Sequence, residues 1–180
     1  MNDEELIQGC IKGNEAYQFE VYNRYSPKLF GVCLRYCANR EEAEDVLQDG
    51  FIKIYKKMDT FKFTGSFEGW MRKIMVHTAL RNKYITYRKH EVNTLDTINH
   101  PEIGEKITSR LVTMDLLKLV NELPQGYKLV FNMFAVEGYS HKEISEMLDI
   151  QEATSRSQYL RARQFLREKL QKLQKDEFRI

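Results

Sequence analysis

Two carboxylates and an amide lie at helical spacing in the segment AEDVLQDGFIKIY. On a helix, Asp45, Gln48 and Asp49 share one face, while the apolar residues between and after them point broadly the other way. Such a polar stripe can bind a partner, but a polar helix face is more often solvated surface. The spacing of these residues alone leaves both interpretations open.

Basic residues are concentrated in two segments, although the formal net charge is only +2. Residues 70–90 carry six Lys or Arg and no acid, and residues 153–175 carry seven against the single acid Glu168. Attraction to phosphates depends on such local clusters more than on the total charge. Both segments are therefore candidates for binding nucleic acid.

The second basic segment follows the pattern of a helix-turn-helix. Gly138 can take the left-handed conformation that ends a helix, and Ser140 with Glu143 forms a capping box that starts the next helix. That short helix would turn at Asp149-Ile150 into another one. This is the spacing of a helix-turn-helix.

The last helix of the motif has one side for packing and another for DNA. Ser155, Tyr159, Ala162 and Leu166 repeat at helical spacing and can pack on the domain. In a major groove Arg reads guanine edges, and Gln or Ser accepts several arrangements. The candidate base readers are Thr154, Arg156, Ser157, Gln158, Leu160 and Arg161. The cations from Arg163 onward would meet phosphates, or would be a solvated helix end that the helix dipole favours.

The elements that position these residues are predicted to be helices. Apolar residues recur every three or four positions over 29–54 and 71–78 and again from about 111, and no stretch alternates convincingly like a strand. After Lys89 the sequence EVNTLDTINHPEIGEK has no helical period and looks like a linker. We therefore expect an all-α chain with a helical domain over 1–90, a flexible linker over 91–109, and a helix-turn-helix domain over 110–180.

Several classes of function are disfavoured. Cys33 and Cys37 are four residues apart and could hold a metal, but their apolar neighbours favour core packing, and with Cys10 the odd number argues against a disulfide framework. The sequence has no glycine-rich phosphate loop, metal cluster or nucleophile constellation, so we expect no catalytic residue, metal or cofactor. The start MNDEELIQ lacks signal-peptide features and no apolar run could span a bilayer, so we expect a cytoplasmic protein without membrane insertion.

Together these segments resemble the extracytoplasmic-function sigma factors of the sigma-70 superfamily over nearly the whole chain. The family's second region is similar to EAEDVLQDGFIKIY and GWMRKIMVHTALRNKY, and its fourth region to LPQGYKLVFNMFAVEGYSHKEISEMLDI and ATSRSQYLRARQFLREKL. The resemblance implies a protein that directs promoter recognition, promoter melting and transcription initiation. It implies three partners: core RNA polymerase through its beta-prime clamp and beta subunit, promoter DNA, and an anti-sigma factor.

The resemblance also implies roles for individual residues. Asp45, Gln48 and Asp49 would dock on the clamp helices of the beta-prime subunit. The loop 61–69 and the helix after it would open and hold the non-template strand of the minus-ten element. Rings and cations suit that role because they bind unstacked bases and phosphates; the residues concerned are Phe61, Lys62, Phe63, Trp70, Arg72, Lys73, His77 and Arg81. Trp70 could equally be a core anchor. The last helix would read the duplex minus-thirty-five element.

Three features depart from the family's usual pattern. His77 stands where the family often has Asn, and Ala153-Thr154-Ser155 stands where it often has Gly-Thr-Val. Gln151 occupies an N-cap place where Ser would be the better cap. The fold does not depend on these positions, but the promoter sequence cannot be transferred from relatives.

One alternative is a dimeric helix-turn-helix transcriptional regulator that acts independently of core polymerase. It predicts a palindromic DNA target and no affinity for core polymerase. The polar stripe and the phenylalanine-rich loop argue against it, because such a regulator needs neither.

Overall fold

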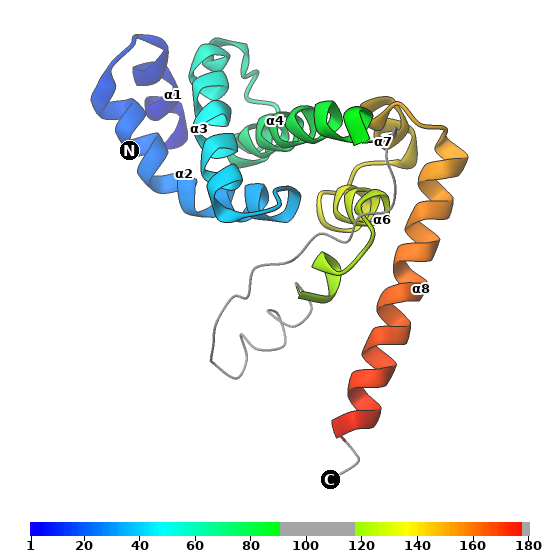
Figure 1. Cartoon of the computed structure of the whole chain (residues 1–180). Helices are drawn as coiled ribbons and strands as arrows, with labels where there is room; N and C mark the ends of the chain where they lie inside the picture. The colour runs from blue at the N-terminus through cyan, green and yellow to red at the C-terminus, as the bar shows by residue number, and fades with distance from the viewer. Residues whose placement is uncertain (91–117, 178–180) are drawn as a thin grey trace. The chain divides into compact units, whose positions relative to one another are not determined.

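A computed structural model describes residues 1–90 and 118–177, the side chains of 82–90 and 174–177 excepted. The chain divides into two compact units, Met1–Pro101 and Glu102–Ile180. Every regular element in the described ranges is a helix, which confirms the all-α prediction (Figure 1). The predicted linker over 91–109 lies outside the described residues.

The first unit is a bundle in which α2 packs against α1, α3 and α4. Asparagine side chains cap its first helices: Asn2, Asn14 and Asn39 each accept a hydrogen bond from a backbone N–H of the first turn. Figure 1 shows α4 crossing α3. The elements are α1 (Asp3–Ile11), α2 (Glu15–Tyr36), α3 (Arg40–Lys56), the short 3-10 helix η1 (Met58–Thr60) and α4 (Phe67–His90).

The contact between α3 and α4 depends on a glycine. A Cβ atom on Gly50 would lie 2.1 Å from the Sδ atom of Met75, so the thioether occupies the space that a side chain would need. Met75 has no exposed surface. A polar contact joins the same two helices, since Lys53 Nζ donates to Thr78 Oγ1 at 3.2 Å. The two helices that carry the candidate site of this unit are thus fixed to each other.

The second unit contains the predicted helix-turn-helix. Gly138 has φ +79°, and Asp149 ends its helix with φ 51°. The Ser140 and Glu143 side chains each bond the other's backbone N–H as a capping box. The local predictions for this motif are therefore confirmed. The elements are α6 (Gln125–Phe131), the π-helix η2 (Asn132–Val136), α7 (His141–Leu148) and α8 (Glu152–Glu177).

The helix α8 is the central element of this unit, because both α6 and α7 pack on it. Ser155 and Ala162 of α8 are fully buried and meet a core that includes Val130, Met133 and Ile144. Farther along, Lys169 Nζ forms a 2.7 Å ion pair with Glu122, just after the helical residues 118–121. The C-terminal half of α8 extends beyond α7 (Figure 1).

We predict that Gly50→Ala destabilises the first unit by about 1–3 kcal/mol, because the added methyl group must displace the buried Met75 side chain. Gly31→Ala is the matched control. Gly31 also lies inside a helix, but a Cβ there meets nothing within 4 Å, so this change should stabilise by roughly 0.5–1 kcal/mol through helix propensity. The single tryptophan, Trp70, lies in this unit, so its fluorescence during urea unfolding reports both effects. Wild-type stability of the Gly50 variant would contradict the close contact.

Candidate functional site

The polar stripe of α3 is exposed. Asp45, Gln48 and Asp49 are all accessible, while the opposite side of the helix, including Val46 and Ile54, is buried. Within the described part of the chain, none of the three polar side chains forms a hydrogen bond or an ion pair with another residue. Two carboxylates and an amide are therefore available to a partner.

An apolar side chain that the sequence analysis missed extends this stripe. Ile52 is 51% exposed and lies three residues after Asp49 and four after Gln48, on the same side of α3. The signal was present in the sequence, because this spacing continues the polar stripe and not the apolar one. The exposed α3 face thus combines anionic groups with an apolar surface, and we call Asp45, Gln48, Asp49 and Ile52 the α3 face.

The loop between η1 and α4 is organised by aromatic rings. Phe67 is 2% exposed and stacks on Trp70 with 5.8 Å between ring centroids, and it meets Tyr25 of α2 edge-on at 5.6 Å. Phe61 packs against both Phe67 and Trp70, at 5.4 and 5.5 Å. Trp70 is half-buried within this cluster, so most of its contacts are those of an anchor that holds the loop.

Phe63 differs from the other rings of the loop. Its side chain is 50% exposed and touches Phe61 at a centroid distance of 5.0 Å. Its φ of 57° lies in the left-handed region, which costs roughly 1–2 kcal/mol for a residue with a Cβ. Such strain persists only where the surrounding structure imposes it, and it is concentrated at functional positions. The loop therefore presents one exposed ring, on a strained backbone, beside a cluster of buried and half-buried rings.

The helix α4, which follows this loop, carries basic side chains. Lys73, His77 and Arg81 are exposed and Arg72 is half-buried, while Lys62 of the loop is exposed as well. The sequence placed these residues away from the apolar positions of α4, and Met71 and Met75 are indeed fully buried. The surface of rings and cations formed by the loop and α4 has the chemistry of a single-strand binding site.

The surroundings of His77 favour the neutral form of its ring. Desolvation lowers its pKa from the ordinary 6.5, and the charges of Lys57 and Lys73 lower the pKa further. A neutral imidazole has one donor and one acceptor nitrogen, whereas the imidazolium has two donors. His77 can therefore offer both kinds of hydrogen bond to a base edge.

The first turns of α8 carry the candidate readers of duplex DNA. Arg156, Ser157, Leu160 and Arg161 are exposed, whereas Thr154 and Gln158 are half-buried. Leu160 is 61% exposed, which leaves its methyl groups open to a base edge.

Four of these side chains have contacts within the unit, and one of them is Ser157, whose Oγ donates to the Thr154 carbonyl at 3.0 Å. Arg156 forms an ion pair with Glu152 one turn earlier, and Arg161 Nη1 donates to Tyr127 Oη at 3.4 Å. The Gln158 amide lies against Gly126 of α6, with its nitrogen 3.2 Å from where a Cβ of that glycine would be. Gln158 is therefore the least available of the candidate readers.

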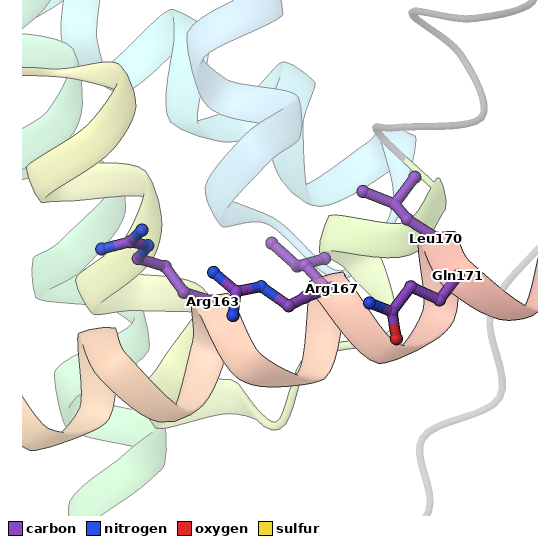
Figure 2. Close-up of a pocket in the computed structure, with 5 residues that line it drawn as sticks. Arg163, Arg167, Leu170 and Gln171 are labelled. Atoms are coloured by element: carbon purple, nitrogen blue, oxygen red, sulfur yellow. The ribbon is translucent and has the colours of Figure 1, made fainter.

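Farther along α8 the basic residues line an open hollow of about 390 Å³, together with Leu166, Leu170 and Gln171. Figure 2 shows Arg163 and Arg167 one turn apart on this stretch of the helix. The Arg163 guanidinium also lies 5.8 Å from the centre of the Tyr159 ring. The position of these cations beyond the reading turns suits contacts with phosphates, which orient a protein without specifying sequence.

Other kinds of site receive no support from the residues that the structure describes. No group of three or more His, Cys, Asp or Glu is placed there to hold a metal ion. Cys10, Cys33 and Cys37 are all buried, and no disulfide joins them. None of the helices in the described ranges is long and apolar enough to cross a membrane.

Comparison with protein families finds two matches in this chain. Residues 21–90 match sigma-70 region 2, and residues 113–166 match sigma-70 region 4. The first region contains the α3 face, the aromatic loop and α4, and the second contains the helix-turn-helix.

Relatives that align with almost the whole chain are sigma factors as well. The ECF RNA polymerase sigma-E factor of Haemophilus influenzae is 28% identical over an alignment of 189 positions, which covers 96% of this chain and 97% of the relative. The ECF RNA polymerase sigma-E factor of Escherichia coli is 25% identical, with 96% of each chain covered.

Two solved structures share the fold. One is CnrH in complex with the cytosolic domain of CnrY, with a TM-score of 0.52 and 20% identity over 94% of this chain and 97% of that one. The other is the sigma factor RpoE in complex with the anti-sigma factor NepR from Bartonella quintana. It has a TM-score of 0.51 and 19% identity over 84% of this chain and 95% of that one.

We predict that Phe63→Asn separates binding from stability. Asn tolerates the left-handed conformation, so the unfolding free energy should change by less than about 1 kcal/mol. Loss of the ring should weaken binding of single-stranded DNA by about 1–3 kcal/mol. Fluorescence anisotropy with an oligonucleotide that the wild-type protein binds on core polymerase measures the second effect, and Phe63→Tyr, which keeps the ring, should bind normally. Wild-type affinity of the Asn variant would contradict a stacking role.

We also predict that His77 titrates below 6.5 in nuclear magnetic resonance spectra of the folded protein. Because the folded state prefers the neutral ring, the stability that His77 contributes is fully present above pH about 6.5 and declines as the pH falls below that value. Lys73→Gln should raise the pKa only in part, because desolvation is the larger cause. A titration midpoint at or above 6.5 would contradict the desolvation of His77 and the effect of the two lysines.

Proposed function

The chain belongs to the extracytoplasmic-function sigma factors of the sigma-70 family, and we propose that the surfaces described above are those with which it binds core RNA polymerase and promoter DNA. As a sigma factor it directs transcription initiation. One observation carries this conclusion: both sigma-70 regions occur, in order, on one chain that aligns with curated sigma factors over 96% of its length. The proposed activity is binding, without a chemical step of its own.

The first unit docks on the polymerase through the α3 face. Asp45, Gln48 and Asp49 offer their polar groups to the clamp helices of the beta-prime subunit, and Ile52 adds apolar area at the end of the stripe. Charge complementarity of this kind favours rapid and specific association, while apolar burial supplies affinity. The exposure of all four side chains supports this assignment.

The same unit holds the melted minus-ten element. The exposed ring of Phe63 stacks on a base of the non-template strand, and Lys62, Lys73 and Arg81 contact its phosphates. The neutral His77 ring reads a base edge at the position where the family often has Asn. Trp70 and Phe67 keep the loop in place from within.

The second unit reads the duplex minus-thirty-five element in the major groove. Arg156, Ser157 and Arg161 make the base-edge contacts, and the cations from Arg163 onward bind phosphates. This unit also contacts the beta subunit of the polymerase.

An anti-sigma factor is the third partner in this proposal. The exposed cations of α4 and α8 would otherwise bind DNA of any sequence through phosphate contacts. The relative RpoE was solved in complex with the anti-sigma factor NepR, which supports a partner of this class. We propose that the protein acts in the cytoplasm, where it would meet core polymerase and promoter DNA. A dimeric regulator that acts without polymerase is not favoured, because it accounts for the second unit alone.

We predict that Asp49→Lys weakens binding to core polymerase by about tenfold, equivalent to roughly 1.4 kcal/mol, because it reverses a charge in the middle of the α3 face. Asp59→Lys makes the same change at an exposed acid of η1, outside that face, and should bind core normally. Affinities for purified core polymerase and run-off transcription on genomic fragments measure the effect, with circular dichroism to verify the helices. Equal affinities of the two variants would contradict the docking assignment.

A further inference from the structure

Three elements of the helix-turn-helix meet at a single side chain, that of His141. The imidazole belongs to the first residue of α7 and stacks on Phe134 of η2, with 4.2 Å between centroids and 12° between the planes. Tyr159 of α8 closes the same cluster, at 5.8 Å from His141 and 4.6 Å from Phe134. A movement of any one of the three elements must therefore disturb this ring.

A polar contact at the same place fixes α7 to α8. His141 Nδ1 and Ser155 Oγ are 2.9 Å apart, so they share a hydrogen bond across fourteen residues of sequence. Ser155 has no exposed surface, so water does not reach its hydroxyl group. In the sequence this serine is one of the departures from the Gly-Thr-Val pattern, and the structure provides its partner.

We propose that His141 is a positioning residue for promoter reading, which acts through its bond to Ser155 to set the first turn of α8. Thr154 and Arg156 are the immediate neighbours of Ser155, so a rotation or bend of this turn moves candidate base readers with it. Contacts to base edges demand placement within about 0.5 Å. The inference rests on the proposed function, since it concerns how the minus-thirty-five element is read.

The consequence of losing His141 Nδ1 follows from the chemistry of serine in helices. A helical Ser without another partner bonds back to the carbonyl four residues earlier, which bends the helix. For Ser155 that carbonyl belongs to Gln151, which already accepts the Ser155 N–H at 3.1 Å as the first bond of α8. The bend would therefore occur in the turn that carries Arg156.

If His141 were only a filler of the aromatic cluster, Phe would replace it well, because the ring on Phe134 would be kept. If the bond to Ser155 is what matters, the change His141→Phe leaves a buried hydroxyl group without its partner, which costs more than replacing both partners by apolar groups. The two roles therefore differ in how changes at His141 and Ser155 combine.

The test uses the full-length protein bound to core polymerase. Duplexes preferred by the wild type are first selected from a random library, and the preference is the ratio of affinities for the selected and a scrambled duplex. The variants are His141→Phe, His141→Asn, Ser155→Ala and the double variant His141→Phe with Ser155→Ala. Asn keeps a hydrogen-bonding atom near the place of Nδ1 but loses the ring. Circular dichroism verifies that each variant is folded.

We expect His141→Phe to lower the preference by about three- to tenfold, with unchanged affinity for scrambled DNA. Ser155→Ala should lower it less, because the half-buried imidazole can still reach water. The double variant should regain most of the preference, and His141→Asn should keep more of it than His141→Phe.

Two results would overturn the inference: full preference in His141→Phe, or a double variant whose loss equals the sum of the single losses. If His141→Phe does not fold, the comparison of His141→Asn with Ser155→Ala decides, since Asn must then keep the greater preference. A wild-type protein that binds core polymerase but shows no upstream preference would overturn the proposed role of α8 itself. That outcome is distinct from the failure of His141 alone.

Discussion

In the first unit, the position of every candidate contact depends on how closely α3 can approach α4. The approach is possible because Gly50 leaves space for the Met75 side chain, and the bond from Lys53 to Thr78 holds the two helices at the same place. The α3 face looks outward from one of these helices, and the aromatic loop leads into the other. The surface proposed to dock on polymerase and the surface proposed to bind DNA thus share one support, the α3–α4 contact.

The helix-turn-helix could be predicted residue by residue because its signals are local. A left-handed glycine at Gly138, the capping box of Ser140 and Glu143, and the turn at Asp149 each involve neighbours within four residues. The exposure of Asp45, Gln48 and Asp49 could also be predicted, since a helix buries only one stripe. The helix α1 was missed, although its capping box at Asn2 and Glu5 was a readable signal.

The features that escaped prediction have no recognisable signal in the local sequence. The π-helix η2, with the Glu137 N–H bonded to the Asn132 carbonyl at 3.0 Å, is not encoded by any turn residue and places Phe134 against His141. Phe63 has a left-handed backbone conformation that phenylalanine rarely adopts, so its cause lies in the packing of the loop and not in the residue type. The bond of His141 to Ser155 joins two helices, and the sequence showed Ser155 only as an unusual residue.

The buried cysteines have a consequence for how the protein can respond to oxidants. The thiolate is the reactive form of cysteine, and burial raises the pKa of Cys33 to about 11 and also raises the pKa of Cys10. Cys37 is buried as well, and no disulfide joins the three. The thiols of Cys10 and Cys33 therefore react with peroxide or a foreign disulfide less readily than an ordinary exposed cysteine. At Cys10 and Cys33, the burial that packs the sulfur atom into the core thus also protects it from oxidation.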